Sequence, residues 1–175
     1  VSGTEAVEQA FERIQTRVRA AVPQARIPGV QVQEMVQGGI EVLCGITRQA
    51  PFGPVLTLGW GGTQVELLQD SRVVLAPFTH ERIGRQLDRT KVAALIAGFR
   101  GAAPKDRETL VDLLVRLTDV FTAYGDRIEA LEINPIAVLD DGHGVRVLDA
   151  LLIPKAPPDP HRHDDSETHP TGAPA

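Results

Sequence analysis

Five short runs of apolar residues, separated by glycine pairs or prolines, fill the stretch from Ile27 to Pro77. Runs of this length between turn residues predict strands, and Gly38-Gly39 predicts a tight hairpin connection between the first two. Before and after this stretch, apolar residues recur at the spacing of helices. Two more apolar runs, residues 128–134 and 145–153, predict a final pair of strands. This order predicts an α+β fold, with a mainly antiparallel sheet and flanking helices.

The expected helices have recognisable ends. Ser2 and Glu5 have the spacing of a capping box, Thr4 is an alternative N-cap, and Pro23 ends the first helix. Three further helices are expected after Thr79, over residues 80–87, after a Thr90 cap and after an Asp106 cap.

The composition excludes several classes of function. The chain has 175 residues and a net charge of -5, which argues against nonspecific nucleic-acid binding because such binding neutralises phosphates with basic side chains. Cys44 is the only cysteine, so an internal disulfide and a multi-cysteine zinc site are excluded. We expect a cytoplasmic protein, because no apolar run is long enough for a membrane span and no signal segment opens the chain.

The two ends of the chain carry separate expectations. Met35 is the only methionine, so either an initiator was removed before Val1 or the chain is a fragment of a longer polypeptide. Residues 155–175 are rich in proline and histidine and lack large apolar side chains, which predicts a disordered tail after a domain over residues 1–154. Three histidines of this tail are either solvated or weak metal ligands, namely His161, His163 and His169.

The last pair of strands carries the strongest chemical pattern. Glu132 and Asn134 point to the same face of a strand because side chains alternate. If residues 140–143 form a four-residue loop, the register places Asn134 opposite Asp149. Three oxygen-bearing side chains would then converge, as Mg²⁺ requires. The alternative is that these are ordinary polar residues on the solvated face of an antiparallel sheet.

Two further patterns are compatible with a nucleotide. The extended segment of residues 32–36 could pair its backbone with an adenine edge, and Glu41 could accept ribose hydroxyls; a plain amphipathic hairpin is the alternative. Gly59, Gly61 and Gly62 allow close approach of a phosphate to the backbone. A glycine turn between strands explains these glycines equally well, because no Walker-type lysine follows them.

Taken in order, these motifs resemble a known family. The series VQEMV, FGPVLTLGWGG with Glu66, GFRG, and EINP followed by Asp149 resembles the C-terminal part of the ATP-grasp module of ADP-forming acyl-CoA synthetases. The family includes the succinyl-CoA synthetase β chain. The resemblance covers roughly residues 3–153 and implies the C-terminal lobe of an ATP-grasp fold.

The resemblance implies roles for the nucleotide-binding residues. Val36 would meet adenine through its backbone at the hinge between the two lobes, with Gln33 or Glu34 in the polar role. Glu41 would hold the ribose. The loop of Gly61 and Gly62 would lie near the phosphates, or near a phosphohistidine segment supplied by another part of the enzyme.

The resemblance also implies a metal site. Asn134 and Asp149 would be magnesium ligands, with Glu132 as a supporting or alternative ligand. The sequence departs from the family at Gln49-Ala50-Pro51, where an aspartate usually precedes the FGP element.

The implied function is that of a ligase module using ATP or ADP and Mg²⁺. The family interconverts acyl-CoA, ADP and phosphate with the acid, CoA and ATP. The N-terminal ATP-grasp lobe, the CoA-binding domain and the phosphohistidine-bearing part are expected as partners, in one chain or in another subunit. A non-catalytic regulatory domain of a protein acetyltransferase and a different ATP-grasp ligase are the alternatives.

Overall fold

The computed structural model describes residues 1–62 and 70–156, in two compact units divided after Met35. The strand expected over residues 65–68, Glu66 and the expected tail beyond residue 156 lie outside the described residues.

The first unit contains one helix, α1 (Thr4–Ala21). The predicted capping box is wrong, because Gly3 occupies the N-cap position and no side chain caps the helix. Glu5 instead accepts a hydrogen bond from the side-chain amide of Gln9 at 3.2 Å. The helix ends before Pro23, as predicted, and none of its residues is buried.

The segment that follows α1 corrects another prediction. Residues 30–36 form no strand, and Gly38-Gly39 therefore does not connect two strands. A strand needs a neighbour for its backbone hydrogen bonds, and no described strand pairs with this segment. Gly38 and Gly39 both have positive φ angles, 73° and 91°.

The second unit is built on a six-stranded sheet in which every pairing is antiparallel, as predicted. The order is β3-β2-β1-β4-β5, and β6 also pairs with β4. The strands are β1 (Ile40–Gln49), β2 (Gly53–Trp60), β3 (Ser71–Leu75), β4 (Ile128–Val138), β5 (Val145–Val147) and β6 (Ala150–Pro154).

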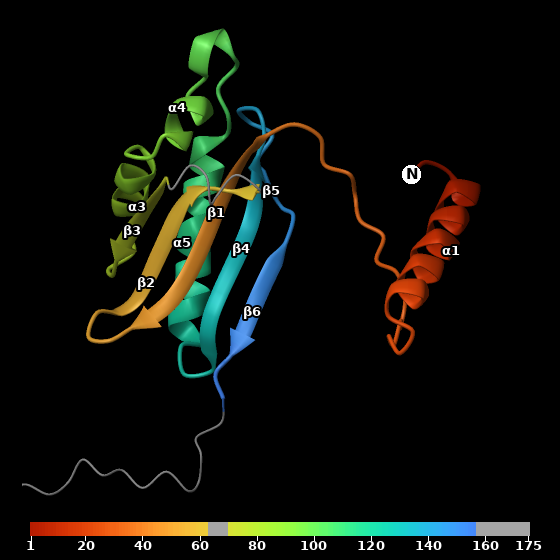
Figure 1. The fold of residues 1–175 in the computed structure, drawn as a ribbon. Coiled ribbons are helices and arrows are strands. Elements are labelled where there is room, and N and C mark those ends of the chain that lie inside the picture. Colours follow the sequence, from red (N-terminus) through yellow and green to blue (C-terminus); the bar gives the residue numbers. More distant parts are fainter. Residues whose placement is uncertain (63–69, 157–175) are drawn as a thin grey trace, which may run out of the picture. The chain divides into compact units, whose positions relative to one another are not determined.

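Helices cover one face of this sheet. Figure 1 shows the longest of them running along the strands. They are α3 (His80–Leu87), α4 (Val92–Ile96), the short 3-10 helix Phe99–Gly101 and α5 (Arg107–Ala123). Asp106 caps α5 as predicted, and Thr79 caps α3, which begins directly after it as expected. The Thr90 hydroxyl accepts from the Ala93 N–H at 3.2 Å, but α4 is shorter than its apolar run.

The core lies between the sheet and the helices. Alternate residues of β1 point into it, so that Val42, Cys44 and Ile46 are fully buried. Leu114 and Phe121 of α5 belong to the same buried cluster. The odd-numbered neighbours on β1, including Glu41, consequently point to the other face of the sheet. Among the described helices, none combines the length and the apolar character needed to cross a bilayer.

Candidate functional site

The register of the last strands decides whether the predicted cluster exists. Leu139 N–H donates to the Gly144 carbonyl at 3.1 Å, and Asn134 N–H donates to the Asp149 carbonyl at 3.2 Å. The predicted register is therefore correct, and Asn134 lies opposite Asp149. Asp149 is placed between β5 and β6, both of which pair with β4.

A bulge in β4 lies at the same position. The pairing with β1 shifts by one residue between Val42 and Cys44, so that two residues of β4, Asn134 and Pro135, lie opposite Leu43. Bulges bend a strand and redirect a side chain. Here the Asn134 side chain reaches Gly62, the second residue after the end of β2.

Gly62 joins the two sides of the candidate site. Its N–H donates to Asn134 Oδ1 at 2.9 Å. The preceding N–H, of Gly61, donates to the carbonyl of Glu41 at 2.9 Å. Two consecutive glycines thus connect β1 with β4, although Gly62 and Asn134 are 72 positions apart in sequence.

Both positions favour glycine, Gly61 because of nearby backbone and Gly62 because of its positive φ. A Cβ on Gly61 would lie 2.6 Å from the Val42 carbonyl carbon, in the backbone of a central strand. Gly62 has φ of 70°, and a Cβ there would overlap the Glu41 carboxylate. The Glu41 carboxylate and the Asn134 amide therefore both border Gly62, one from each neighbouring strand.

The polar groups fit a magnesium ion by their chemistry. Asn134 Oδ1 accepts one hydrogen bond, and an amide oxygen has a second lone pair. Asp149 is exposed, and its Oδ1 accepts from Ala150 N–H at 2.9 Å. Glu132 is exposed two residues before Asn134. These are oxygen donors, which Mg²⁺ prefers, usually in company with substrate phosphates.

The described part of the chain holds no metal cluster made only of acidic, histidine or cysteine side chains. No group of three or more His, Cys, Asp or Glu side chains there is arranged to hold a metal ion. A cation at this place would therefore need the Asn134 amide oxygen among its ligands, and Mg²⁺ usually also takes substrate phosphates. This requirement agrees with the site of a metal–nucleotide complex.

The remaining predicted residues fall in two places. Gln33 and Glu34 are exposed and belong to the first unit. Val36 is half-buried at the start of the second unit, which also holds Glu41 and the glycines. The adenine-binding role of Gln33, Glu34 and Val36 stays a prediction.

The comparisons with known proteins identify the family of the chain. A family model described as an ATP-grasp domain matches residues 1–153. The chain belongs to this ATP-grasp family. The ADP-forming acetate–CoA ligase I of Archaeoglobus fulgidus is 35% identical over 143 residues, which is 82% of this chain and 21% of that ligase. The β subunit of the ADP-forming acetate–CoA ligase II of Pyrococcus furiosus is 32% identical over 155 residues, which is 89% of this chain and 66% of that subunit.

Solved structures give the same result. An acetyl-coenzyme A synthetase 1 of Ca. Korarchaeum cryptofilum, bound to coenzyme A and acetyl-coenzyme A with a phosphorylated phosphohistidine segment, matches with a TM-score of 0.80 and 32% identity, covering 89% of this chain and 68% of that chain. Another structure of it contains coenzyme A and Mg-AMPPCP and matches with a TM-score of 0.65 and 31% identity, over 70% of this chain and 56% of that chain. The ATP-grasp chain thus spans about a fifth of one ligase and two thirds of a β subunit.

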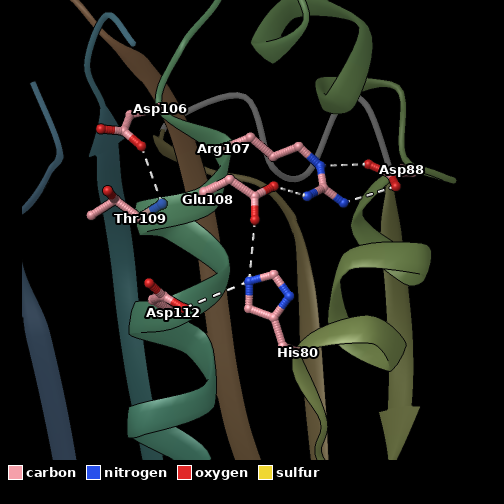
Figure 2. A network of polar contacts seen from close by, with 7 residues as sticks. All are labelled: His80, Asp88, Asp106, Arg107, Glu108, Thr109 and Asp112. Carbon is pink, nitrogen blue, oxygen red and sulfur yellow. Dashed lines mark hydrogen bonds and ion pairs between the residues drawn. The ribbon is translucent and has the colours of Figure 1, made fainter. Parts of the chain in front are cut away.

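Other polar groups of this ATP-grasp lobe hold its helices together. Arg107 Nε and Nη2 donate to the Asp88 carboxylate at 2.9 and 2.8 Å, which raises the pKa of Arg107. His80 Nε2 lies 3.3 Å from Glu108 Oε2 and 3.6 Å from Asp112 Oδ1. Figure 2 shows that these contacts join α3 and its following turn to α5. None of them includes a residue that borders Gly62.

Cys44 is a packing residue. It is fully buried in β1, and burial raises the pKa of its thiol to about 12. The thiolate, which is the nucleophilic form, is therefore absent at neutral pH.

Sequence reasoning missed one buried carboxylate. Asp70 is 6% exposed and accepts hydrogen bonds from the N–H groups of Lys91 at 2.7 Å and Val92 at 3.0 Å. It thus binds the start of α4 from a position 21 residues earlier in the chain. Such spacing carries no local motif, so the sequence offered no signal for it.

Proposed function

We propose that this chain is the magnesium–nucleotide-binding lobe of an ADP-forming acyl-CoA synthetase, an acid–thiol ligase. The observation that carries the proposal is the meeting of Glu41 and Asn134 at Gly62, with Asp149 opposite Asn134. The similarity to ADP-forming ligases supports the reaction class.

The nucleotide would contact one end of the sheet. Glu41 would accept hydrogen bonds from the ribose hydroxyls, since a carboxylate is an acceptor only. Gly61 and Gly62 lack side chains that would keep a phosphate away from the backbone. The backbone of Val36, with Gln33 or Glu34, would complete the adenine contact.

Asn134 and Asp149 would hold the magnesium ion, with Glu132 as a supporting ligand. The ion, when bound, supplies positive charge that offsets the repulsion between nucleotide phosphates and an approaching anionic group. Gly62 N–H fixes the Asn134 side chain through its hydrogen bond, which orients the free lone pair of Oδ1. The chain itself therefore acts by positioning and by charge compensation.

The complete reaction would need further parts. The matched relatives include a separate β subunit and much longer ligases. We propose that an N-terminal ATP-grasp lobe and a domain or subunit with CoA-binding and phosphohistidine functions act together with this lobe.

The test is binding of Mg–ADP to the native polypeptide that contains this segment, with its co-purifying partners, by isothermal titration calorimetry. Asn134→Ala and Asp149→Ala should each weaken binding about tenfold or more, in the range seen when the surroundings of a metal are altered. Asp141→Ala is the matched control, because Asp141 is an exposed aspartate in the adjoining turn. Asp149→Ala leaves the Gly62 hydrogen bond intact and so separates metal binding from folding.

Unchanged affinity in both variants would contradict the site assignment. Release of ADP from ATP that depends on both CoA and an organic acid would support the acid–thiol ligase reaction. Turnover without CoA would instead indicate another ATP-grasp ligase.

A further inference from the structure

A separate cleft lies at the outer edge of the sheet, between β3 and α3. Its volume is about 590 Å³, and it is lined by residues 73–75 of β3 together with Arg82, Arg85, Gln86 and Arg89 of α3 and the following turn. Figure 1 shows β3 at the border of the sheet with α3 beside it. No residue proposed for nucleotide binding lines this cleft.

The lining of the cleft is strongly basic. It contains three guanidinium groups and no carboxylate. Arg85 pairs with Glu81 at 3.0 Å, in an exposed contact along the helix. Arg82 and Arg89 form no ion pair within the described part of the chain. Because like charges gathered in one cleft repel each other, an anion bound there would relieve that repulsion.

A fourth arginine lies at the same border. Arg72 of β3 donates from Nη2 to the carbonyl of Arg89 at 2.9 Å. This bond ties the turn after α3 to β3 and brings the cationic side chains of both elements together. The whole chain has a net charge of -5, so the charge of the cleft is opposite in sign to the net charge of the chain. A ligand of this cleft would therefore be anionic.

The strand edge indicates what kind of anion fits. β3 pairs with β2 on one side, and no described strand pairs with its other side. Such an edge offers unpaired N–H and C=O groups to an added strand. Val73 and Leu75 are also 56% and 39% exposed. Backbone pairing and apolar contact favour a peptide over a small phosphate ion.

We propose that this cleft binds an extended acidic peptide segment of a partner protein, added as a strand to the outer edge of β3. Side chains of an added strand alternate between the two faces of the sheet. Acidic residues on the helix face would contact Arg82, Arg85 and Arg89. Apolar residues on the other face would lie beside Val73 and Leu75. The preferred segment therefore alternates acidic and apolar residues.

The test is fluorescence anisotropy on the full chain with a labelled peptide of alternating Glu and Val. The double substitution Arg82→Glu with Arg89→Glu should weaken binding about tenfold or more, because it replaces attraction with repulsion at two contacts. Arg116→Glu with Arg127→Glu is the matched control, since both arginines are exposed elsewhere and the change in net charge is equal. The control should bind like the parent chain.

Two further probes separate strand addition from simple charge attraction. A peptide with alternate amides N-methylated keeps its carboxylates but loses the backbone donors, and it should bind at least about tenfold more weakly. Inorganic tripolyphosphate tests the small-anion alternative. If Arg82→Glu with Arg89→Glu prevents folding, as judged by circular dichroism, Arg82→Gln with Arg89→Gln replaces it.

The proposal is overturned if the arginine substitutions leave the affinity for the peptide unchanged, or if the N-methylated peptide binds with the same affinity as the unmodified one. Binding of tripolyphosphate at these arginines without peptide binding also overturns it, because the cleft would then hold a small anion.

Discussion

Gly62 provides a direct test of the geometry around Glu41 and Asn134. The substitution Gly62→Ala has two effects that the structure separates. The first is backbone strain, because Gly62 has φ of 70° and an L-residue in this region costs about 1–2 kcal/mol. The second is overlap of the new Cβ with the Glu41 carboxylate. Since that carboxylate ends a flexible, exposed side chain, it would swing away rather than deform the sheet.

Gly142→Ala isolates the first effect. Gly142 has φ of 76°, and a Cβ there would meet nothing within 4 Å. We therefore expect it to lower the free energy of unfolding by the same ~1–2 kcal/mol. Gly62→Ala should lower it further, because the carboxylate must move. The assay is urea unfolding followed by circular dichroism, with the midpoint compared at constant m-value.

The double mutant completes the test. Glu41→Ala removes the group that the new Cβ would meet, and by itself it should change stability by less than about 0.5 kcal/mol because Glu41 is exposed. Gly62→Ala with Glu41→Ala should then resemble Gly142→Ala, giving a coupling energy of at least about 0.5 kcal/mol. Strict additivity of the two substitutions would refute the proposed contact between Glu41 and Gly62.

Three other predictions concern buried groups. Asp106→Ala should destabilise the chain by about 1–2 kcal/mol, because Asp106 caps α5 and also accepts from Gly144 N–H at 2.9 Å. Its hydrogen bonds with Thr109 lower the pKa of Asp106 below the ordinary 3.8. The difference in free energy of unfolding between parent and variant should therefore be complete above about pH 4 and should shrink as the pH falls through the lowered pKa. Urea titrations at several pH values measure this difference. Asp70→Ala should lower the free energy of unfolding by about 2–4 kcal/mol, since two N–H groups at the start of α4 lose their acceptor. Thermal unfolding measures this loss, and a value near zero would show that water replaces the Asp70 carboxylate. Cys44 should react with Ellman's reagent at neutral pH only on unfolding, because burial raises the pKa of its thiol to about 12; rapid labelling of the folded chain would contradict this.

Local patterns predicted most elements of the second unit. Turn residues between short apolar runs indicated the antiparallel strands, and Thr79 and Asp106 marked the starts of two helices. The failures concern residues 30–36 and the cap of α1. The segment of residues 30–36 has the composition of a strand but no described partner, and strand formation depends on a partner as much as on composition.

The sequence by itself determined the register of the final strands. A short loop after Leu139 fixes every later pair, and the contact of Asn134 with Asp149 follows from it. Tertiary structure alone decided that Gly62 would bind Asn134, that Asp70 would cap α4, and that four arginines would gather at the edge of β3. The spacing of Arg82, Arg85 and Arg89 placed them along one helix, but only the packing of α3 against β3 made a cleft. Contacts between distant segments depend on how the whole sheet and its helices pack, and no short sequence window contains that information.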